Sequence, residues 1–286
     1  AIFAYPGNNN NYTYTVSVKG SSFIECSAKT GNKQSTSGFG GGGICAYKVK
    51  GLTVEACTFD ACDTLCGGGA VAAIVKNTTT VDNDTVTINN CSFNQCNCKA
   101  QAGALAVYQD SNTASNSATK LSVIGSTFNN CSSGTNNGSG GAIQCYLPCM
   151  AFSNSSFTDC LAGKEGGAIN NFFASKYGDM WSKSSLTVEN CTFTNCRAED
   201  RYQADQMQHY GGAINTKVKT VTVTNSTFTD CVSTLREGGA LHLGGISAGS
   251  AATITGSTFK NCMAKTSGGA VMASTETLTV SDSFFY

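Results

Sequence analysis

Charged residues are scarce in this sequence. Only 13% of the 286 residues are charged, and 18 acidic side chains balance 18 basic ones. Proteins that bind nucleic acid or anionic lipid need a basic surface, and electrostatic steering of a substrate needs a field of one sign. The composition therefore predicts no nucleic-acid partner and no charged membrane surface as a partner.

The sequence also lacks signals for membranes and metals. No apolar run is long enough for a transmembrane helix, and no signal peptide or lipidation motif is visible. We therefore expect no membrane insertion. The only histidines are His209 and His242, and the paired spacing of zinc-binding cysteines is missing. We predict no metal and no other cofactor.

Proline is nearly absent, with 2 residues against 32 glycines, and a repeat fills the chain instead. Its core is Ser/Thr-Phe-x-x-Cys, and successive copies lie 26 to 36 residues apart. A repeat of this length is typical of a solenoid. The phenylalanines are Phe23, Phe59, Phe93, Phe128, Phe157, Phe193, Phe228 and Phe259, and Phe285 begins a ninth copy.

Each copy contains the signals of three strands. Before the Phe, apolar residues alternate with Ser or Thr, as in 221–223, which is typical of a strand with one buried face. The residue three before Phe is Gly, Asn or Asp in eight of nine copies, and these types tolerate the left-handed region at a bend. A Gly-Gly-Ala-aliphatic step follows in most copies.

These features predict an all-β fold, a single-domain parallel β-helix of about nine coils. We take it as right-handed from the general preference of parallel crossovers. Residues 13–286 contain the repeats, and residues 1–12 form an apolar arm or cap.

The alternation of Gly-Gly-Ala-aliphatic with Phe-x-x-Asn/Cys resembles the repeats of chlamydial polymorphic outer-membrane proteins and related protist surface proteins. The resemblance covers nearly the whole chain. It implies a surface β-helix used in adhesion or in building an extracellular layer. This chain differs by having Cys in every complete copy, where Asn is the usual residue of those repeats.

Cysteine is abundant, with 16 residues. An even, high count favours an oxidising, extracellular compartment and some disulfides. The alternative is that stacked cysteines only pack as small apolar side chains. Two pairs are the disulfide candidates: Cys57 with Cys91, in one column of consecutive coils, and Cys145 with Cys149, across a short loop.

Nine Asn-x-Ser/Thr sequons predict N-linked glycans if the source is eukaryotic, and none by this route if it is bacterial. Those in the bend column are weaker evidence, because Asn already has a conformational reason to occur there. The candidates are Asn11, Asn77, Asn83, Asn90, Asn130, Asn137, Asn154, Asn190 and Asn225.

Apolar residues at both ends predict assembly. The N-terminal cluster either folds over the first coil of its own chain or docks on the next subunit. The ninth copy ends without a polar capping repeat, and head-to-tail stacking through two uncapped ends would build a filament. The assembly candidates are Ile2, Phe3, Tyr5, Phe284, Phe285 and Tyr286.

An enzyme is the least favoured class. Polysaccharide-active β-helices need paired carboxylates or a calcium-binding cluster. The acidic residues here are scattered and do not recur in one column on adjacent coils. We therefore predict a protein that is not an enzyme, with a polysaccharide-active enzyme as the weakest alternative.

We predict a structural subunit of an extracellular fibre or surface coat, a head-to-tail homopolymer that carries covalent glycans. The alternative is a cell-surface adhesin that binds a host or carbohydrate partner through lateral loops. Candidate loops are the charged segment 197–210 and the aromatic segment 172–181.

Overall fold

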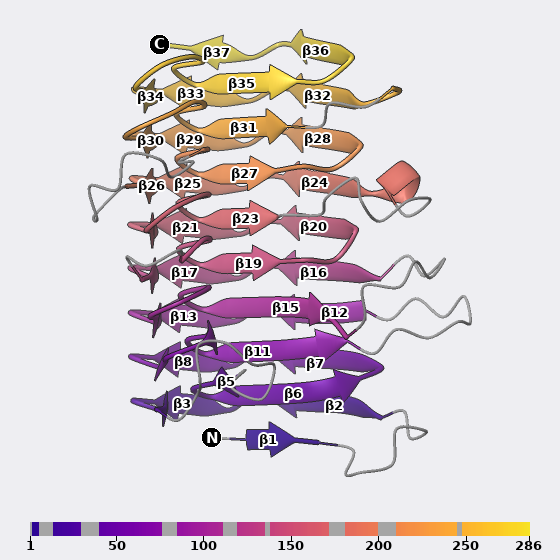
Figure 1. Ribbon diagram of the computed structural model, residues 1–286, viewed down its shortest axis with the longest axis vertical. Coiled ribbons are helices and arrows are strands. Elements are labelled where there is room, and N and C mark those ends of the chain that lie inside the picture. The colour runs from indigo at the N-terminus through magenta and orange to yellow at the C-terminus, as the bar shows by residue number, and fades with distance from the viewer. Residues whose placement is uncertain are drawn as a thin grey trace.

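The structure is a computed structural model and describes residues 2–5, 14–29, 40–75, 85–110, 119–134, 138–171, 181–199, 210–244 and 248–286. These residues form 37 strands, β1 to β37, and one short 3-10 turn at 181–183. Three nine-stranded sheets and one eight-stranded sheet run the length of the molecule (Figure 1). We name them sheets A, B, C and D.

Sheets A and B contain the longer strands. Sheet A consists of β1 (Ile2–Ala4), β6 (Ile44–Val49), β11 (Val71–Val75), β15 (Leu105–Gln109), β19 (Ile143–Cys145), β23 (Ile169–Asn171), β27 (Ile214–Thr216), β31 (Leu241–Gly244) and β35 (Val271–Ser274). Sheet B consists of β2 (Thr15–Lys19), β7 (Gly51–Glu55), β12 (Thr85–Asn89), β16 (Lys120–Ile124), β20 (Cys149–Ser153), β24 (Ser185–Glu189), β28 (Thr220–Thr224), β32 (Ala251–Thr255) and β36 (Thr277–Ser281).

Sheets C and D contain strands of two or three residues. Sheet C consists of β3 (Ser22–Ile24), β8 (Thr58–Asp60), β13 (Ser92–Asn94), β17 (Thr127–Asn129), β21 (Ser156–Thr158), β25 (Thr192–Thr194), β29 (Thr227–Thr229), β33 (Thr258–Lys260) and β37 (Phe284–Phe285). Sheet D consists of β4 (Ser27–Ala28), β9 (Asp63–Thr64), β14 (Asn97–Cys98), β18 (Ser132–Ser133), β22 (Leu161–Ala162), β26 (Arg197–Ala198), β30 (Val232–Ser233) and β34 (Met263–Ala264). A separate pair, β5 (Gly40–Gly41) and β10 (Gly67–Gly68), precedes the second and third coils.

One coil passes through sheets A, B, C and D in order, and every strand pairs in parallel with its equivalents in the neighbouring coils. The first coil is β1 to β4, and the ninth is β35 to β37. Followed upward in Figure 1, the chain crosses the near face to the right and returns along the far face, which is a right-handed coil. The predicted fold, an all-β parallel β-helix of nine coils, is confirmed.

The predicted bends between sheets B and C are confirmed. All nine residues of this column have a positive φ, between 49° and 60°, including the one residue that is not Gly, Asn or Asp, Ala56. A second bend column, two residues after the Phe, has φ of 50° to 54°. Three of its eight residues are Glu25, Ala61 and Gln95, and the other five are Asn or Asp, so this column carried a turn signal that was not used in the prediction.

The core is a stack of phenylalanine rings. From Phe23 to Phe285, successive ring centroids lie 4.6 to 4.8 Å apart in nearly parallel planes. This spacing equals the distance between neighbouring strands, so the backbone ladder itself sets the ring separation. Glycines in the turns that lead into sheet A let neighbouring coils approach closely: a Cβ added at Gly239 would collide with the carbonyl oxygen of Gly269 in the next coil.

The described part of the predicted arm or cap is Ile2–Tyr5. Its residues Ile2–Ala4 form β1, the first strand of sheet A, which pairs with β6 of the same chain. This segment is therefore part of the first coil.

Candidate functional site

The six assembly candidates lie at the two ends of the β-helix and are exposed (Figure 1). Ile2 and Phe3 are in β1, and Tyr5 follows it. Phe284 and Phe285 form β37, and Tyr286 follows it. Both end coils present one unpaired edge of every strand that they contribute, and unpaired edges are templates for further strand pairing.

The inner side chains of the two end coils differ in burial. In the ninth coil Val280 is 45% exposed and Phe285 is 49% exposed. Their counterparts in the first coil, Val18 and Phe23, are each 8% exposed. In sheets B and C the first coil is therefore less exposed than the ninth, although its strand edges are unpaired and Val16 is only partly buried. In sheet A, Ile2 remains 40% exposed.

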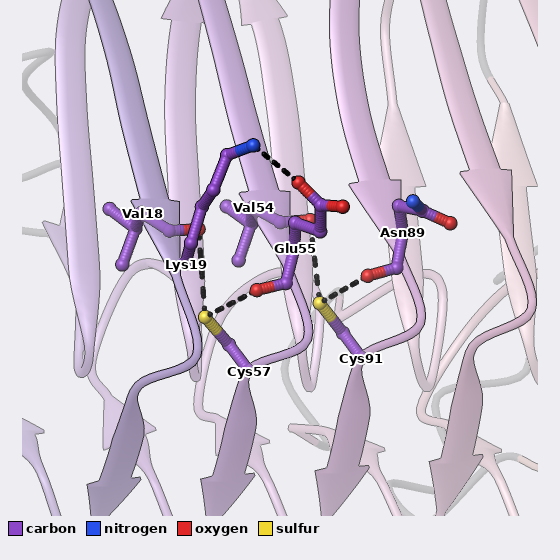
Figure 2. A network of polar contacts seen from close by, with 7 residues as sticks. All are labelled: Val18, Lys19, Val54, Glu55, Cys57, Asn89 and Cys91. Carbon is purple, nitrogen blue, oxygen red and sulfur yellow. Dashed lines mark hydrogen bonds and ion pairs between the residues drawn. The ribbon is translucent and has the colours of Figure 1, made fainter.

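All 16 cysteines are free thiols, so the predicted disulfides are not formed. Figure 2 shows Cys57 and Cys91 side by side and pointing in the same direction. The sulfur of Cys57 lies 3.6 Å from the Val18 oxygen and that of Cys91 lies 3.4 Å from the Val54 oxygen, each a carbonyl of the preceding coil. A disulfide needs Cβ atoms about 3.8 Å apart, whereas parallel side chains on neighbouring strands keep the strand spacing of about 4.8 Å.

Cys145 and Cys149 are kept apart by their places in different sheets. Cys145 ends β19 and packs in the core, where its sulfur accepts a hydrogen bond from the Leu147 N–H at 3.4 Å. Cys149 begins β20 on the outer side, and its sulfur lies 3.4 Å from the Lys183 carbonyl oxygen of the next coil. Here too, side-chain direction rather than sequence distance opposes the predicted pairing.

A column of eight thiols runs beside the Phe stack. We call it the thiol column: Cys26, Cys62, Cys96, Cys131, Cys160, Cys196, Cys231 and Cys262. From Cys62 onward, each sulfur lies 3.4 to 3.7 Å from the carbonyl oxygen of the Phe in the preceding coil. Hydrogen bonding to Cys96, together with burial, raises the pKa of Cys62, and burial raises the pKa of Cys196. Thiols with raised pKa values form little thiolate and are poor nucleophiles, which favours a structural role for Cys62 and Cys196.

Five of the nine glycan candidates are described, and all five side chains are exposed: Asn90, Asn130, Asn154, Asn190 and Asn225. Asn130 lies in the second bend column, so every described sequon asparagine occupies a left-handed bend. Exposure is compatible with glycosylation, but the conformational reason for Asn applies to all five. Asn11, Asn77, Asn83 and Asn137 lie outside the described residues.

A buried row of polar side chains on the outer face of sheet A was not predicted. We call it the polar ladder: Gln144, Asn170, Asn215 and His242, one in each of the fifth to eighth coils. Asn215 donates from Nδ2 to Asn170 Oδ1 at 2.8 Å, and His242 Nδ1 lies 2.7 Å from Asn215 Oδ1. Because that oxygen can only accept, Nδ1 carries the proton. At the other end, Gln144 accepts a hydrogen bond from Tyr108 and donates one to Tyr146.

Ionisable residues flank the polar ladder in a neighbouring column. Glu165, Tyr210 and Glu237 stand in consecutive coils, each directly before a Gly-Gly step, and backbone hydrogen bonds link these levels. The carboxyl group of Glu165 is buried, and burial raises its pKa. The acids at 165 and 237 therefore share a column two coils apart, although they do not meet in adjacent coils.

His242 lies within this cluster. Its ring stacks on Tyr210 with centroids 4.2 Å apart, and its Nε2 atom lies 3.8 Å from Glu237 Oε2. Burial, with a smaller effect of the Lys217 charge, lowers the pKa of His242 to about 4. The contact with Glu237 is therefore not an ion pair at neutral pH, because the imidazole is uncharged.

The sequence contained a signal for the polar ladder. The residue after each Gly-Gly-Ala-aliphatic step is polar in four consecutive copies, GGAIQ, GGAIN, GGAIN and GGALH. In the earlier copies the same position is Cys45, Ala72 or Ala106. Alternation predicts an outward direction for this side chain but not its burial.

Most of the two lateral loops lies outside the described residues, at 172–180 and 200–209. Of the flanking residues, Trp181 is buried and Arg197 is exposed. Among the residues that the structure describes, no group of three or more His, Cys, Asp or Glu side chains could hold a metal ion. In the same residues, no helix is long and apolar enough to cross a membrane.

The fold and the repeated columns define a parallel β-helix protein. Consistent with this class, the family model described as a right handed beta helix region matches residues 150–286, which begin within the fifth coil. No curated protein and no solved structure matches the chain significantly. The comparisons thus support a β-helix repeat family, and they do not distinguish the chlamydial type from others.

Proposed function

We propose that the protein is a non-enzymatic structural subunit of an extracellular fibre or surface coat, which assembles head to tail through its end coils. The observation that supports this most is the open ninth coil. Its inner side chains Leu278, Val280 and Phe285 continue the columns of the core and are exposed to solvent. Another coil placed on them would bury this apolar surface and pair three strand edges.

The partner in this proposal is the first coil of a second copy. Its strands β1, β2 and β3 are the equivalents of β35, β36 and β37 in sheets A, B and C. Stacking would continue each column with its register unchanged. The burial of Val18 and Phe23 means that the first coil must rearrange before its core meets the ninth coil, so assembly should be slow and nucleated.

Electron microscopy of the purified 286-residue chain tests the proposal. We expect filaments with an axial repeat of roughly 40 Å, the height of nine strand spacings. Val280→Asp would place a charge in the joint and should abolish filaments while leaving the monomer folded, because Val280 is on the open face.

Thr279→Asp is the matched control for this variant. Thr279 is on the same strand but faces outward, so the charge would remain in solvent and filaments should persist. Isolated rods in the parent chain, or filaments that survive Val280→Asp, would refute the head-to-tail joint.

A second candidate function is adhesion through a side face. Tyr108 and Tyr146 stack on the outer side of sheet A with ring centroids 4.7 Å apart, and both are partly exposed. Exposed aromatic rings are a common platform for sugars. Binding to immobilised oligosaccharides that is lost in Tyr146→Ala, in a chain that forms no filaments, would favour adhesion over assembly.

We propose no catalysis at the column of Glu165 and Glu237. Tyr210 occupies the level between these two carboxyl groups, where a glycosidase would need room for its substrate. Burial of Glu165 and His242 further restricts access. Hydrolysis of a polysaccharide by the parent chain, lost in Glu165→Gln, would overturn this assignment.

Location outside the cell and glycosylation complete the proposal. Exposure of the five described sequon asparagines supports it. Intact mass before and after enzymatic removal of N-glycans, measured on protein from the natural source, tests it. An unchanged mass would remove the glycoprotein assignment without affecting the assembly proposal.

A further inference from the structure

The polar ladder ends in a residue that can change its charge. Asn170 and Asn215 continue the ladder through uncharged amides, whereas its last member is His242, which is 6% exposed. An amide in this position could make the same contact at any pH. A histidine makes it as a neutral ring only while its second nitrogen stays unprotonated.

The groups around His242 do little to stabilise the positively charged ring that a second proton would create. Strand β27 contributes Asn215, and Lys217 follows this strand. The turn before β31 contributes Glu237, whose side chain is partly exposed, and Tyr210 covers one face of the ring. Strand β35 places the uncharged Met272 opposite. A protonated ring would thus have one anion at 3.8 Å and one nearby cation, in a site removed from water.

We propose that His242 is an acid-sensitive latch: its protonation opens the eighth coil and with it the C-terminal end of the β-helix. The latch goes beyond the proposed fibre function, because it concerns the closure of the coil in a single chain and can be measured without assembly.

The direction of the pH effect follows from the two states of the ring. Burial lowers the pKa of His242 from 6.5 to about 4 in the closed coil, and an opened coil restores the ordinary value. The closed coil is therefore most stable above pH 6.5, and its stability relative to the open coil decreases as the pH falls from 6.5 toward 4. At pH 5 the opening equilibrium should be about 30-fold larger than at pH 8.

Glu165 acts in the opposite direction. Because burial raises its pKa, acid removes an unfavourable charge from the sixth coil. Opening by acid should therefore be confined to the eighth and ninth coils, with the sixth coil unaffected or tighter. This spatial pattern separates the latch from general acid unfolding.

Hydrogen exchange followed by mass spectrometry tests the latch with a matched variant. His242→Asn gives the eighth coil the residue of the sixth and seventh coils and should keep the ladder without a titratable group. At pH 5, peptides from β31 and β35 should exchange about 30-fold faster in the parent than in this variant, and equally at pH 8. Peptides from β11 and β15 should exchange alike in both proteins at both pH values.

NMR titration of the histidine ring provides a second measurement that leaves His242 unchanged. The chain has only two histidines, and a His209→Gln variant assigns them. We expect His242 to titrate near pH 4. A midpoint near 6.5, or equal exchange of parent and His242→Asn at pH 5, would overturn the proposal.

Discussion

The first and ninth coils contain equivalent inner side chains in different surroundings. Val18 and Phe23 are buried, though less completely than their equivalents in the middle of the β-helix, whereas Val280 and Phe285 are close to half exposed. The repeat assigns each of these side chains to the core in the same way. The difference shows that a position in the repeat sets the direction of a side chain, and that only a neighbouring layer removes it from water.

The phenylalanine column gives the largest test of this difference. Phe23→Ala and the interior Phe157→Ala should each lower the free energy of unfolding by about 3–5 kcal/mol, because each removes a buried ring. Phe285→Ala should cost about 1–2 kcal/mol, since much of its ring is already in water. Urea unfolding followed by circular dichroism measures all three. Equal losses in Phe23→Ala and Phe285→Ala would mean that the first coil is as open as the ninth.

A glycine pair tests the same contrast on the backbone. Gly239→Ala forces a Cβ against the carbonyl oxygen of Gly269, so we expect a loss of about 1–3 kcal/mol or more. At Gly269 itself the nearest atom to an added Cβ is the Cys262 carbonyl oxygen, 3.6 Å away, and Gly269→Ala should change stability by under about 0.5 kcal/mol. Thermal unfolding of the two variants is sufficient. A large loss in Gly269→Ala would indicate a layer above the ninth coil.

The buried carboxyl group of Glu165, beside the polar ladder, tests how burial affects a charged side chain. Burial raises the pKa of Glu165 above its ordinary value of 4.5. The protein is therefore most stable with respect to this group below pH 4.5, where the carboxyl group is protonated in both states, and its free energy of unfolding falls as the pH rises through the pKa of the folded state. Glu165→Gln should therefore be more stable than the parent at pH 7 and equal to it at pH 4. Denaturant midpoints at the two pH values decide this. Equal midpoints at pH 7 would show that the carboxyl group is hydrated.

Thiol labelling measures the smallest difference and compares cysteines near the two ends of the β-helix, Cys26 and Cys262. Only Cys26, Cys149 and Cys262 are partly exposed, so iodoacetamide at pH 8 should modify at most three thiols in the folded chain. Cys262 should react slowly, since hydrogen bonding to Cys231 and burial raise its pKa. After unfolding without reductant, all 16 should react. If fewer than 16 thiols are labelled after unfolding, the isolated protein contains disulfides.

Sequence reasoning could predict the architecture because short-range chemistry repeats in register. Alternation before each Phe specified the strands of sheet B, and Gly, Asn or Asp specified the bend before sheet C. The second bend column was missed although five of its eight residues are Asn or Asp; in the other three, Glu25, Ala61 and Gln95, the left-handed conformation is one that the side chains do not favour. The strands on either side impose it.

The cysteine pairs show a different limit of sequence reasoning. A shared column places Cys57 and Cys91 close together, and the sequence indicated this correctly. It could not indicate that both side chains point the same way toward carbonyl oxygens of the preceding coil. Side-chain direction at this level depends on the local backbone geometry of the bend.

The sequence by itself determined the coil: which residues form strands, where the chain bends, and which side chains face the Phe stack. These follow from periodicity and from backbone preferences, which act over a few residues. The tertiary structure alone decided which ends are covered, that the outward-facing Asn170, Asn215 and His242 are buried, and that Glu165 and Glu237 share one column. Burial and charge interaction depend on contacts between coils, such as those of Asn215 with Asn170 and His242, which are 45 and 27 residues away, and no local pattern encodes them.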